Sequence, residues 1–140
     1  MDERPHKKLK LWKAAIDFVV AIYEITRAFP REEEFGLKSQ LRRAAVSVPS
    51  NIAEGLTRST KADKKNFLNI PQSSLSEIDA QLEISERLGL VDQQAMGRVA
   101  AQMRDVYMLL SGLQRSIKER RRSFPVIRYP QFVIHRSLSD

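Results

Sequence analysis

The chain has 140 residues, a length typical of a single domain with its own hydrophobic core. It contains no cysteine, which excludes disulfides and thiolate chemistry, and it carries a net charge of +7. No apolar run reaches the ~18 residues of a membrane span, and the N-terminal MDERPHKK does not resemble a signal peptide. We therefore expect a soluble cytoplasmic protein that makes no membrane contact.

The positive charge is concentrated in two zones. Residues 37–66 and residues 115–140 each hold seven basic and two acidic side chains, a net charge of +5. Residues 67–114 hold three basic and six acidic side chains, a net charge of −3. Two basic zones favour a polyanionic partner such as RNA or DNA. The alternative is an ordinary solvated surface on a basic protein.

The first predicted helix covers residues 9–29 and has two apolar stripes, whereas a surface helix normally has one. A second apolar face predicts a homo-oligomer, and the alternative is a central helix buried within a monomer. One stripe contains Leu9, Trp12, Ile16, Val19 and Tyr23. The other contains Leu11, Ala15, Phe18, Ile22, Ile25 and Phe29, of which Leu11, Phe18, Ile22 and Ile25 are our candidates for the interface between subunits.

The segment FPREEEFG, residues 29–36, is expected to end this first helix. Phe29 precedes a proline and is therefore biased away from helical geometry. The acidic triplet that follows suits the start of the next helix, where backbone N–H groups have no partner.

The next segment contains VSVPSNIAEGLTR, residues 46–58, which places a proline inside an apolar helical pattern. The apolar spacing of three and four residues continues from Leu37 to Leu56 without a change of phase. This predicts one helix over 37–58, bent at Pro49, with Ser47, Ser50 and Asn51 available to bond the freed backbone. The alternative is a helix that stops at Val48, followed by a new helix capped by Ser50.

Gly55 and Glu54 lie near the end of this second helix. Gly55 either caps the helix or, inside it, allows close approach of a neighbouring helix, and we favour close packing. Glu54 lies four residues before Arg58, so an intrahelical ion pair is its simplest role and a catalytic carboxylate the alternative.

The third and fourth helices are predicted over 60–89 and 92–121. Thr60 with Asp63 resembles a capping arrangement, Gly89 is a natural terminator, and Asp92 suits an N-cap. Pro71 predicts a bend or short break near residues 70–74. Together the four helices predict an all-α, antiparallel up-and-down bundle over 1–122, followed by a non-helical tail over 123–140.

The segment QLRRAAVSVPSNIAEG, residues 40–55, resembles the four-helix-bundle proteins encoded in intervening sequences of bacterial 23S rRNA genes. FPREEEFGL before it and SLSEIDAQLEISERLGLV after it extend the resemblance over residues 9–113. The resemblance implies an antiparallel four-helix bundle that assembles as a homopentameric ring. More distantly, the chain is similar to the basic accessory proteins of diversity-generating retroelements, which associate with a reverse transcriptase and nucleic acid.

One departure from this family lies in the third helix. The family pattern there usually reads Ile-Ala-x-Gly-Ser-Leu, whereas residues 70–75 read IPQSSL. Pro71 replaces an alanine and Ser73 replaces a glycine, so the continuity of this helix and its close contacts come into question.

The sequence contains no recognisable catalytic constellation, metal-ligand spacing or phosphate-binding glycine loop. We expect no enzyme activity, no metal and no cofactor. The candidates for nucleic-acid binding are basic side chains able to contact phosphates without base specificity. One of the adjacent pair Arg42 and Arg43 has a salt bridge between helices or subunits as its alternative role. The full set is Arg42, Arg43, Arg58, Lys61, Lys64, Lys65, Arg120, Arg121 and Arg122.

Two hypotheses about function follow. The first is a non-enzymatic oligomeric adaptor that binds nucleic acid, RNA foremost, through backbone contacts. No aromatic residues interleave the basic clusters, so stacking of single-stranded bases is not expected. The second is a protein–protein scaffold that assembles a homo-oligomeric ring and binds a protein partner.

Overall fold

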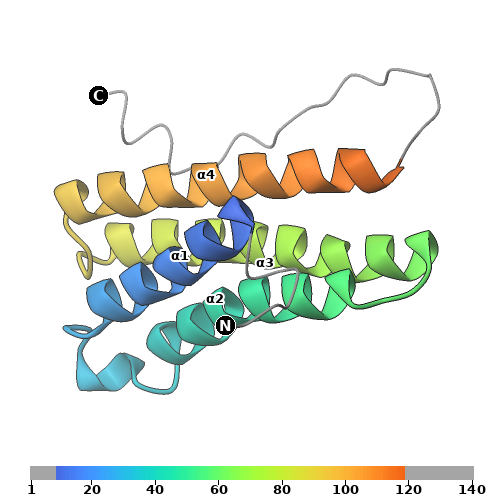
Figure 1. The fold of residues 1–140 in the computed structure, drawn as a ribbon. Helices are drawn as coiled ribbons and strands as arrows, with labels where there is room; N and C mark the ends of the chain where they lie inside the picture. The colour runs from blue at the N-terminus through green and yellow to red at the C-terminus, as the bar shows by residue number, and fades with distance from the viewer. Residues whose placement is uncertain (1–8, 119–140) are drawn as a thin grey trace, which may run out of the picture.

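Four long helices make up the structure, a computed structural model that describes residues 9–118 (Figure 1). They are α1 (Lys10–Thr26), α2 (Leu37–Leu56), α3 (Lys61–Arg87) and α4 (Gln93–Lys118), with a short 3-10 helix, η2 (Arg31–Glu33), between α1 and α2. They run alternately up and down, and within residues 9–118 there is no strand. The predicted all-α four-helix bundle is confirmed, and the predicted tail lies outside the described residues.

Each helix packs against two neighbours around a single core. The closely packed pairs are α1 with α2, α2 with α3, α3 with α4 and α4 with α1, while the backbones of diagonally opposite helices stay farther apart. The largest fully buried side chains come from all four helices. They are Phe18, Ile22, Leu41, Ile52, Leu68, Leu75, Ile78, Leu82, Met96, Met103 and Leu110. None of the described helices combines the length and the apolar character that a bilayer crossing requires.

The outcome for α1 corrects the predicted subunit interface. Leu11, Phe18 and Ile22 are buried in the core of their own subunit, and Ile25 is half-buried against it. The first three are therefore covered within the bundle, and a second subunit cannot reach them. The other stripe is the exposed one: Ile16 and Tyr23 are each 37% exposed. Both stripes are apolar in sequence, so the pattern alone did not show which of them faces the core.

The acidic triplet, residues 32–34, lies just before α2 and contacts its first turn, as predicted. The Glu33 carboxylate accepts a hydrogen bond from the backbone N–H of Leu37 at 2.9 Å, and Glu34 pairs with Lys38 at 3.1 Å. Both contacts place negative charge at the N-terminus of α2, where the helix dipole favours it. α1 itself ends at Thr26, three residues earlier than predicted.

The predicted caps of α3 and α4 are confirmed. Thr60 Oγ1 accepts from the N–H of Asp63 at 3.1 Å, and Asp92 Oδ1 accepts from the N–H of Ala95 at 2.8 Å. Gly89 has a φ of +77°, and the N–H of Leu90 bonds back to the Ser85 carbonyl at 2.9 Å. This is the Schellman arrangement, in which a left-handed residue satisfies the last carbonyls of a helix.

Helix α2 continues through the buried Pro49, so the alternative of two helices is wrong. Polar side chains near Pro49 bond carbonyls within the same helix. Asn51 donates to the Ser47 carbonyl at 2.8 Å, and Ser47 Oγ donates to the Ala44 carbonyl at 2.8 Å. Ser50 is exposed. Ser47 and Asn51 therefore bond backbone carbonyls in this part of the helix, but these are the carbonyls of Ala44 and Ser47 and not the Ala45 carbonyl that Pro49 frees.

Helix α3 also continues through a buried proline, Pro71, which contradicts the predicted break. A proline lacks the N–H that would bond the carbonyl four residues earlier, and its ring crowds that turn. That carbonyl belongs to Phe67. The neighbouring helix α4 supplies a donor to the next carbonyl along, because the Gln114 amide donates to the Leu68 carbonyl at 3.1 Å. Ser73, at the position of the family's glycine, is exposed, so no close contact depends on it.

Contacts between α2 and α3 recur at about seven-residue intervals. Going along α2, Gln40 accepts from Gln81 at 3.3 Å, and Ser47 and Ser74 share a hydrogen bond of 2.5 Å. At the end of α2, the position of a Cβ on Gly55 lies 3.0 Å from Cβ of Phe67, at the start of α3. Close packing at the buried Gly55 is thereby confirmed. Gly55 does not cap the helix, because the C-cap of α2 is Thr57.

Candidate nucleic-acid interface

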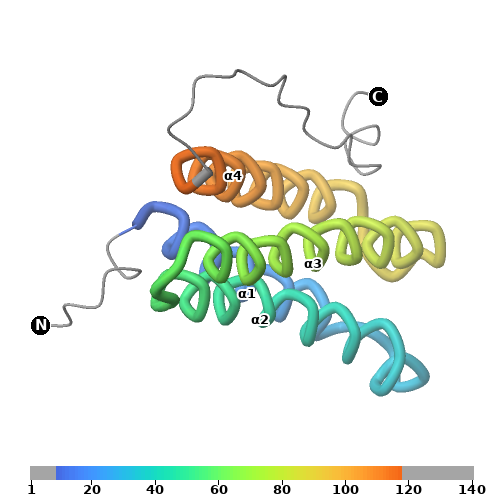
Figure 2. The backbone as a smooth tube through the Cα atoms, turned by 90° about the vertical axis from the view of Figure 1, so that its right-hand side faces the viewer, coloured from blue at the N-terminus to red at the C-terminus, as the bar shows by residue number. Residues whose placement is uncertain are grey.

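The two ends of the bundle carry opposite charge. The α2–α3 connection, the start of α1 and the end of α4 lie at one end (Figure 2). Basic side chains dominate this basic end: Lys10, Lys13, Arg58, Lys61, Lys64, Lys65 and Arg115, against Glu54 and Asp63. At the acidic end the carboxylates Glu24, Glu32, Glu33, Glu34, Glu83, Glu86 and Asp92 narrowly outnumber the cations Arg27, Arg31, Lys38, Arg42, Arg43 and Arg87. The bundle is therefore polarised along its length.

Three lysines in the first turns of α3 form a cluster of cations at the basic end. Lys61, Lys64 and Lys65 are three and four residues apart, so they share one face of the helix. Lys61 and Lys65 are exposed and Lys64 is half-buried. Within residues 9–118 their ammonium groups make no ion pair or hydrogen bond. A compact, mobile charge of this kind suits contact with phosphates.

Arg58 lies beside these lysines but is engaged in the packing of α2 on α3. Its guanidinium pairs with Glu54 at 2.8 Å and lies 4.2 Å from the centre of the Phe67 ring. Its Nε is buried. The predicted ion pair of Glu54 is confirmed, and Arg58 joins the end of α2 to the start of α3. Its charge still belongs to the basic end, but its side chain is held in place.

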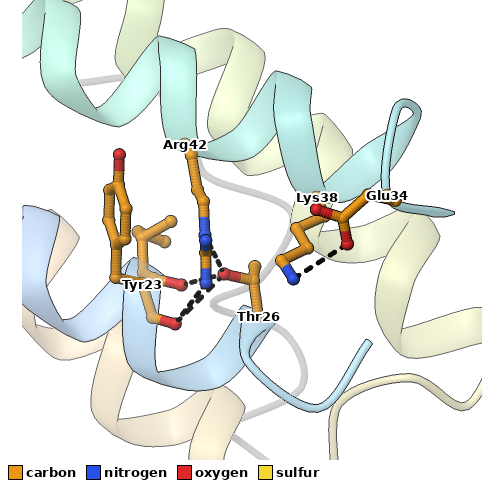
Figure 3. Close-up of polar contacts among 6 residues, drawn as sticks. Tyr23, Thr26, Glu34, Lys38 and Arg42 are labelled. Carbon is orange, nitrogen blue, oxygen red and sulfur yellow. Dashed lines mark hydrogen bonds and ion pairs between the residues drawn. The ribbon is translucent and has the colours of Figure 1, made fainter. Parts of the chain in front are cut away.

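Arg42 extends from α2 and makes its contacts at the C-terminal end of α1 (Figure 3). From α2 its Nε donates to Thr26 Oγ1 at 2.8 Å, and a terminal nitrogen donates to the Tyr23 carbonyl at 3.0 Å. The guanidinium also lies 4.3 Å from the centre of the Tyr23 ring. Thr26 is buried and donates onward to the Ile22 carbonyl at 2.7 Å. Arg42 thus caps the C-terminus of α1, where cations are favoured, and ties it to α2.

The remaining predicted candidates are spread over the chain. Arg43 is exposed on α2 and bonds Ser39 one turn earlier at 3.2 Å, near the end of α2 that lies away from the three lysines. Arg120, Arg121 and Arg122 lie outside the described residues. The structure therefore brings together Arg58, Lys61, Lys64 and Lys65, and it separates Arg42 and Arg43 from them.

Sequence reasoning missed the partners of Arg42. Tyr23 was predicted as part of an apolar stripe, and Thr26 was not singled out. No spacing rule links a residue in one helix to a cap at the end of another, because this contact depends on the angle of the connection between them. Among residues 9–118, no group of three or more histidine or acidic side chains is placed to hold a metal ion.

Comparison with known proteins identifies relatives of the chain. Residues 7–112 match the family model described as 23S rRNA-intervening sequence protein. A crystal structure of a protein of unknown function from the S23 ribosomal protein family, from Bacteroides thetaiotaomicron VPI-5482, has the same fold. Its TM-score is 0.68 at 22% sequence identity, over 74% of this chain and 96% of that one. No curated protein matches the chain.

The neighbours Arg42 and Arg43 are expected to respond differently to the same substitution. Arg42→Met removes two hydrogen bonds from the end of α1 and should lower the free energy of unfolding by about 2 kcal/mol. Arg43→Met removes an exposed contact and should change it by less than about 0.5 kcal/mol. Urea unfolding at one protein concentration measures both. Equal losses would show that Arg42 does not cap α1 in solution.

Proposed function

Since the chain belongs to the 23S rRNA-intervening sequence protein family, we propose that it is a non-enzymatic adaptor that binds nucleic acid, foremost RNA. The observation that carries this proposal is the basic end of the bundle. There Lys61, Lys64 and Lys65 share one helix face and make no ion pair within the described chain.

The chemistry of the basic end favours phosphate contacts over base recognition. Ammonium groups bind phosphates as point charges and release counterions, which gives affinity without sequence preference. Phe67 is the aromatic side chain beside these lysines, and Arg58 already lies over its ring. The Phe67 ring is half-buried and already contacted by a cation, so phosphate contacts fit this site better than base stacking on Phe67. We infer that the ligand is structured RNA or a duplex, recognised by its shape and backbone.

Assembly of several copies would strengthen such binding. Three lysines per subunit give a weak contact alone, and each additional subunit repeats the same contact on one ligand. The polarity of the bundle supports this geometry, because the acidic end would face away from a phosphate backbone. The homopentamer implied by the family resemblance remains part of the proposal.

Charge reversal at the three lysines tests nucleic-acid binding. Lys61→Glu/Lys64→Glu/Lys65→Glu should weaken binding of a hairpin RNA at least tenfold at about 0.1 M salt and lower the salt slope by about 2. Fluorescence anisotropy of labelled RNA across a salt series measures both quantities. The same titration with a DNA duplex compares the two ligands.

A charge-matched control keeps this test specific. Arg27→Glu/Arg31→Glu/Arg87→Glu changes the net charge equally but lies at the acidic end. It should reduce binding much less than the lysine variant. Equal losses in the two variants, or no binding of RNA by the unchanged protein at low salt, would overturn the proposal.

The second candidate function, a protein–protein scaffold, is favoured by an exposed apolar strip. On α1 the strip contains Ile16, Val20 and Tyr23, and Val20 is 50% exposed. On α2, Val46 is 40% exposed and lies one turn after Arg42, which contacts Tyr23. The strip therefore spans α1 and α2 on one side of the bundle. It replaces the buried residues first predicted as the subunit interface.

Self-association through this strip has a direct test. A glutamate in an apolar contact is costly to bury, so Ile16→Glu or Val46→Glu should shift an oligomer toward the monomer mass. Light scattering at micromolar concentration measures the mass. Ala80→Glu on an exposed position of α3 should leave it unchanged. A protein that is already monomeric, or strip variants that keep the oligomer mass, would contradict this assembly.

A further inference from the structure

A groove of about 930 Å³ lies between α1 and α4, near the acidic end of the bundle. Its floor is apolar and includes Ala21 and Ile25 from α1 and Val99 from α4. Its charged lining consists of Asp17, Glu24, Asp92 and Arg98, three acidic side chains and one basic. The groove is thus an apolar slot with a net negative rim, in a protein whose overall charge is +7.

We propose that residues 123–136 of the same chain occupy this groove. The segment reads SFPVIRYPQFVIHR and contains seven apolar or aromatic side chains, two arginines and no acidic residue. The composition of the segment therefore complements the groove in two ways. Its apolar side chains suit the apolar floor, and Arg128 or Arg136 suits the acidic rim. Pro125 and Pro130 disfavour a helix and favour an extended chain that can lie along a groove.

The length of the chain allows this docking within one molecule. The groove contacts α4 between Ala95 and Gln102, which is about 24 to 35 Å back along the helix from Lys118. Eight extended residues after Lys118 span about 27 Å, and sixteen span about 53 Å. Residues 126–134 can therefore lie beside α4 in the groove. The proposal is independent of nucleic-acid binding, because the groove lies away from Lys61, Lys64 and Lys65.

Cross-linking in the full chain tests the docking, and the absence of native cysteines leaves no background. Ala21→Cys in the groove is combined with Gln131→Cys in the segment. The control combines Gln131→Cys with Ala80→Cys, an exposed alanine of α3. A short bis-maleimide should join the groove pair at least fivefold more than the control pair, after correction for the reactivity of each cysteine with a monofunctional maleimide.

The mass of the cross-linked product separates the possible occupants. Docking within one chain predicts a product of monomer mass on a denaturing gel. A product of doubled mass would assign the groove to a second copy and overturn the proposal. Equal yields for the groove and control pairs would also overturn it, since the segment would then not prefer the groove.

Charge substitutions at the acidic rim provide a second, independent test of the docking. Arg128→Glu and Glu24→Lys should each lower the yield of the groove pair about threefold, and the two changes together should recover part of that loss. Yields that stay the same in both single variants would contradict the charge match on which the docking rests.

Discussion

Two buried prolines in neighbouring helices set the constraint on which the rest of the structure depends. Pro49 and Pro71 each remove one backbone hydrogen bond, yet α2 and α3 remain continuous. Continuity matters because contacts between these helices recur about every seven residues, the spacing that keeps one helical face against another. A break at either proline would shift that spacing. Ser47 would then lose its hydrogen bond to Ser74, and Gly55 would no longer pack against the start of α3.

The arginines and lysines of this bundle have different roles, in line with their chemistry. A guanidinium is planar, stacks on aromatic rings and donates in several directions, which suits contacts that join one helix to the next. Arg42 and Arg58 are used in this way, each over an aromatic ring and each at the end of a helix. The lysines at the start of α3 are left to the solvent. Net charge alone therefore overstates the positive charge that is free to meet a ligand.

How well the sequence predicted each part of the structure depends on how far apart in the sequence the interacting residues lie. The helices and their caps depend on residues a few positions apart, so Thr60, Asp92 and Gly89 were identifiable. The turn of α3 before Pro71 receives a hydrogen bond from Gln114, more than 40 residues away, and no local pattern reveals that donor. For α1, two equally apolar stripes do not show which one faces the core. At the candidate site, the cluster of lysines was predictable, whereas the capping role of Arg42 depended on the packing of two helices.

The bundle thus combines a closed interior with several surfaces suited to partners. The basic end lies apart from the exposed strip of α1 and α2 and from the groove between α1 and α4, and these last two adjoin each other at Val20. We propose the three surfaces as contacts for a phosphate backbone, another subunit and an apolar basic segment, respectively. The proposed function is therefore that of a protein that brings partners together.

The central claim is that α2 and α3 stay continuous through their buried prolines, so that residues of the two helices meet in register along their contact. A double-mutant cycle between Ser47→Ala and Ser74→Ala tests it most directly, with urea unfolding as the readout. Each single substitution should lower the free energy of unfolding by about 1 kcal/mol, and the second should cost less than half of that once the first has been made, because the hydrogen bond between the two hydroxyls is then already lost. Equal costs in the two backgrounds would contradict the claim, because Ser47 and Ser74 would then not meet across the two helices.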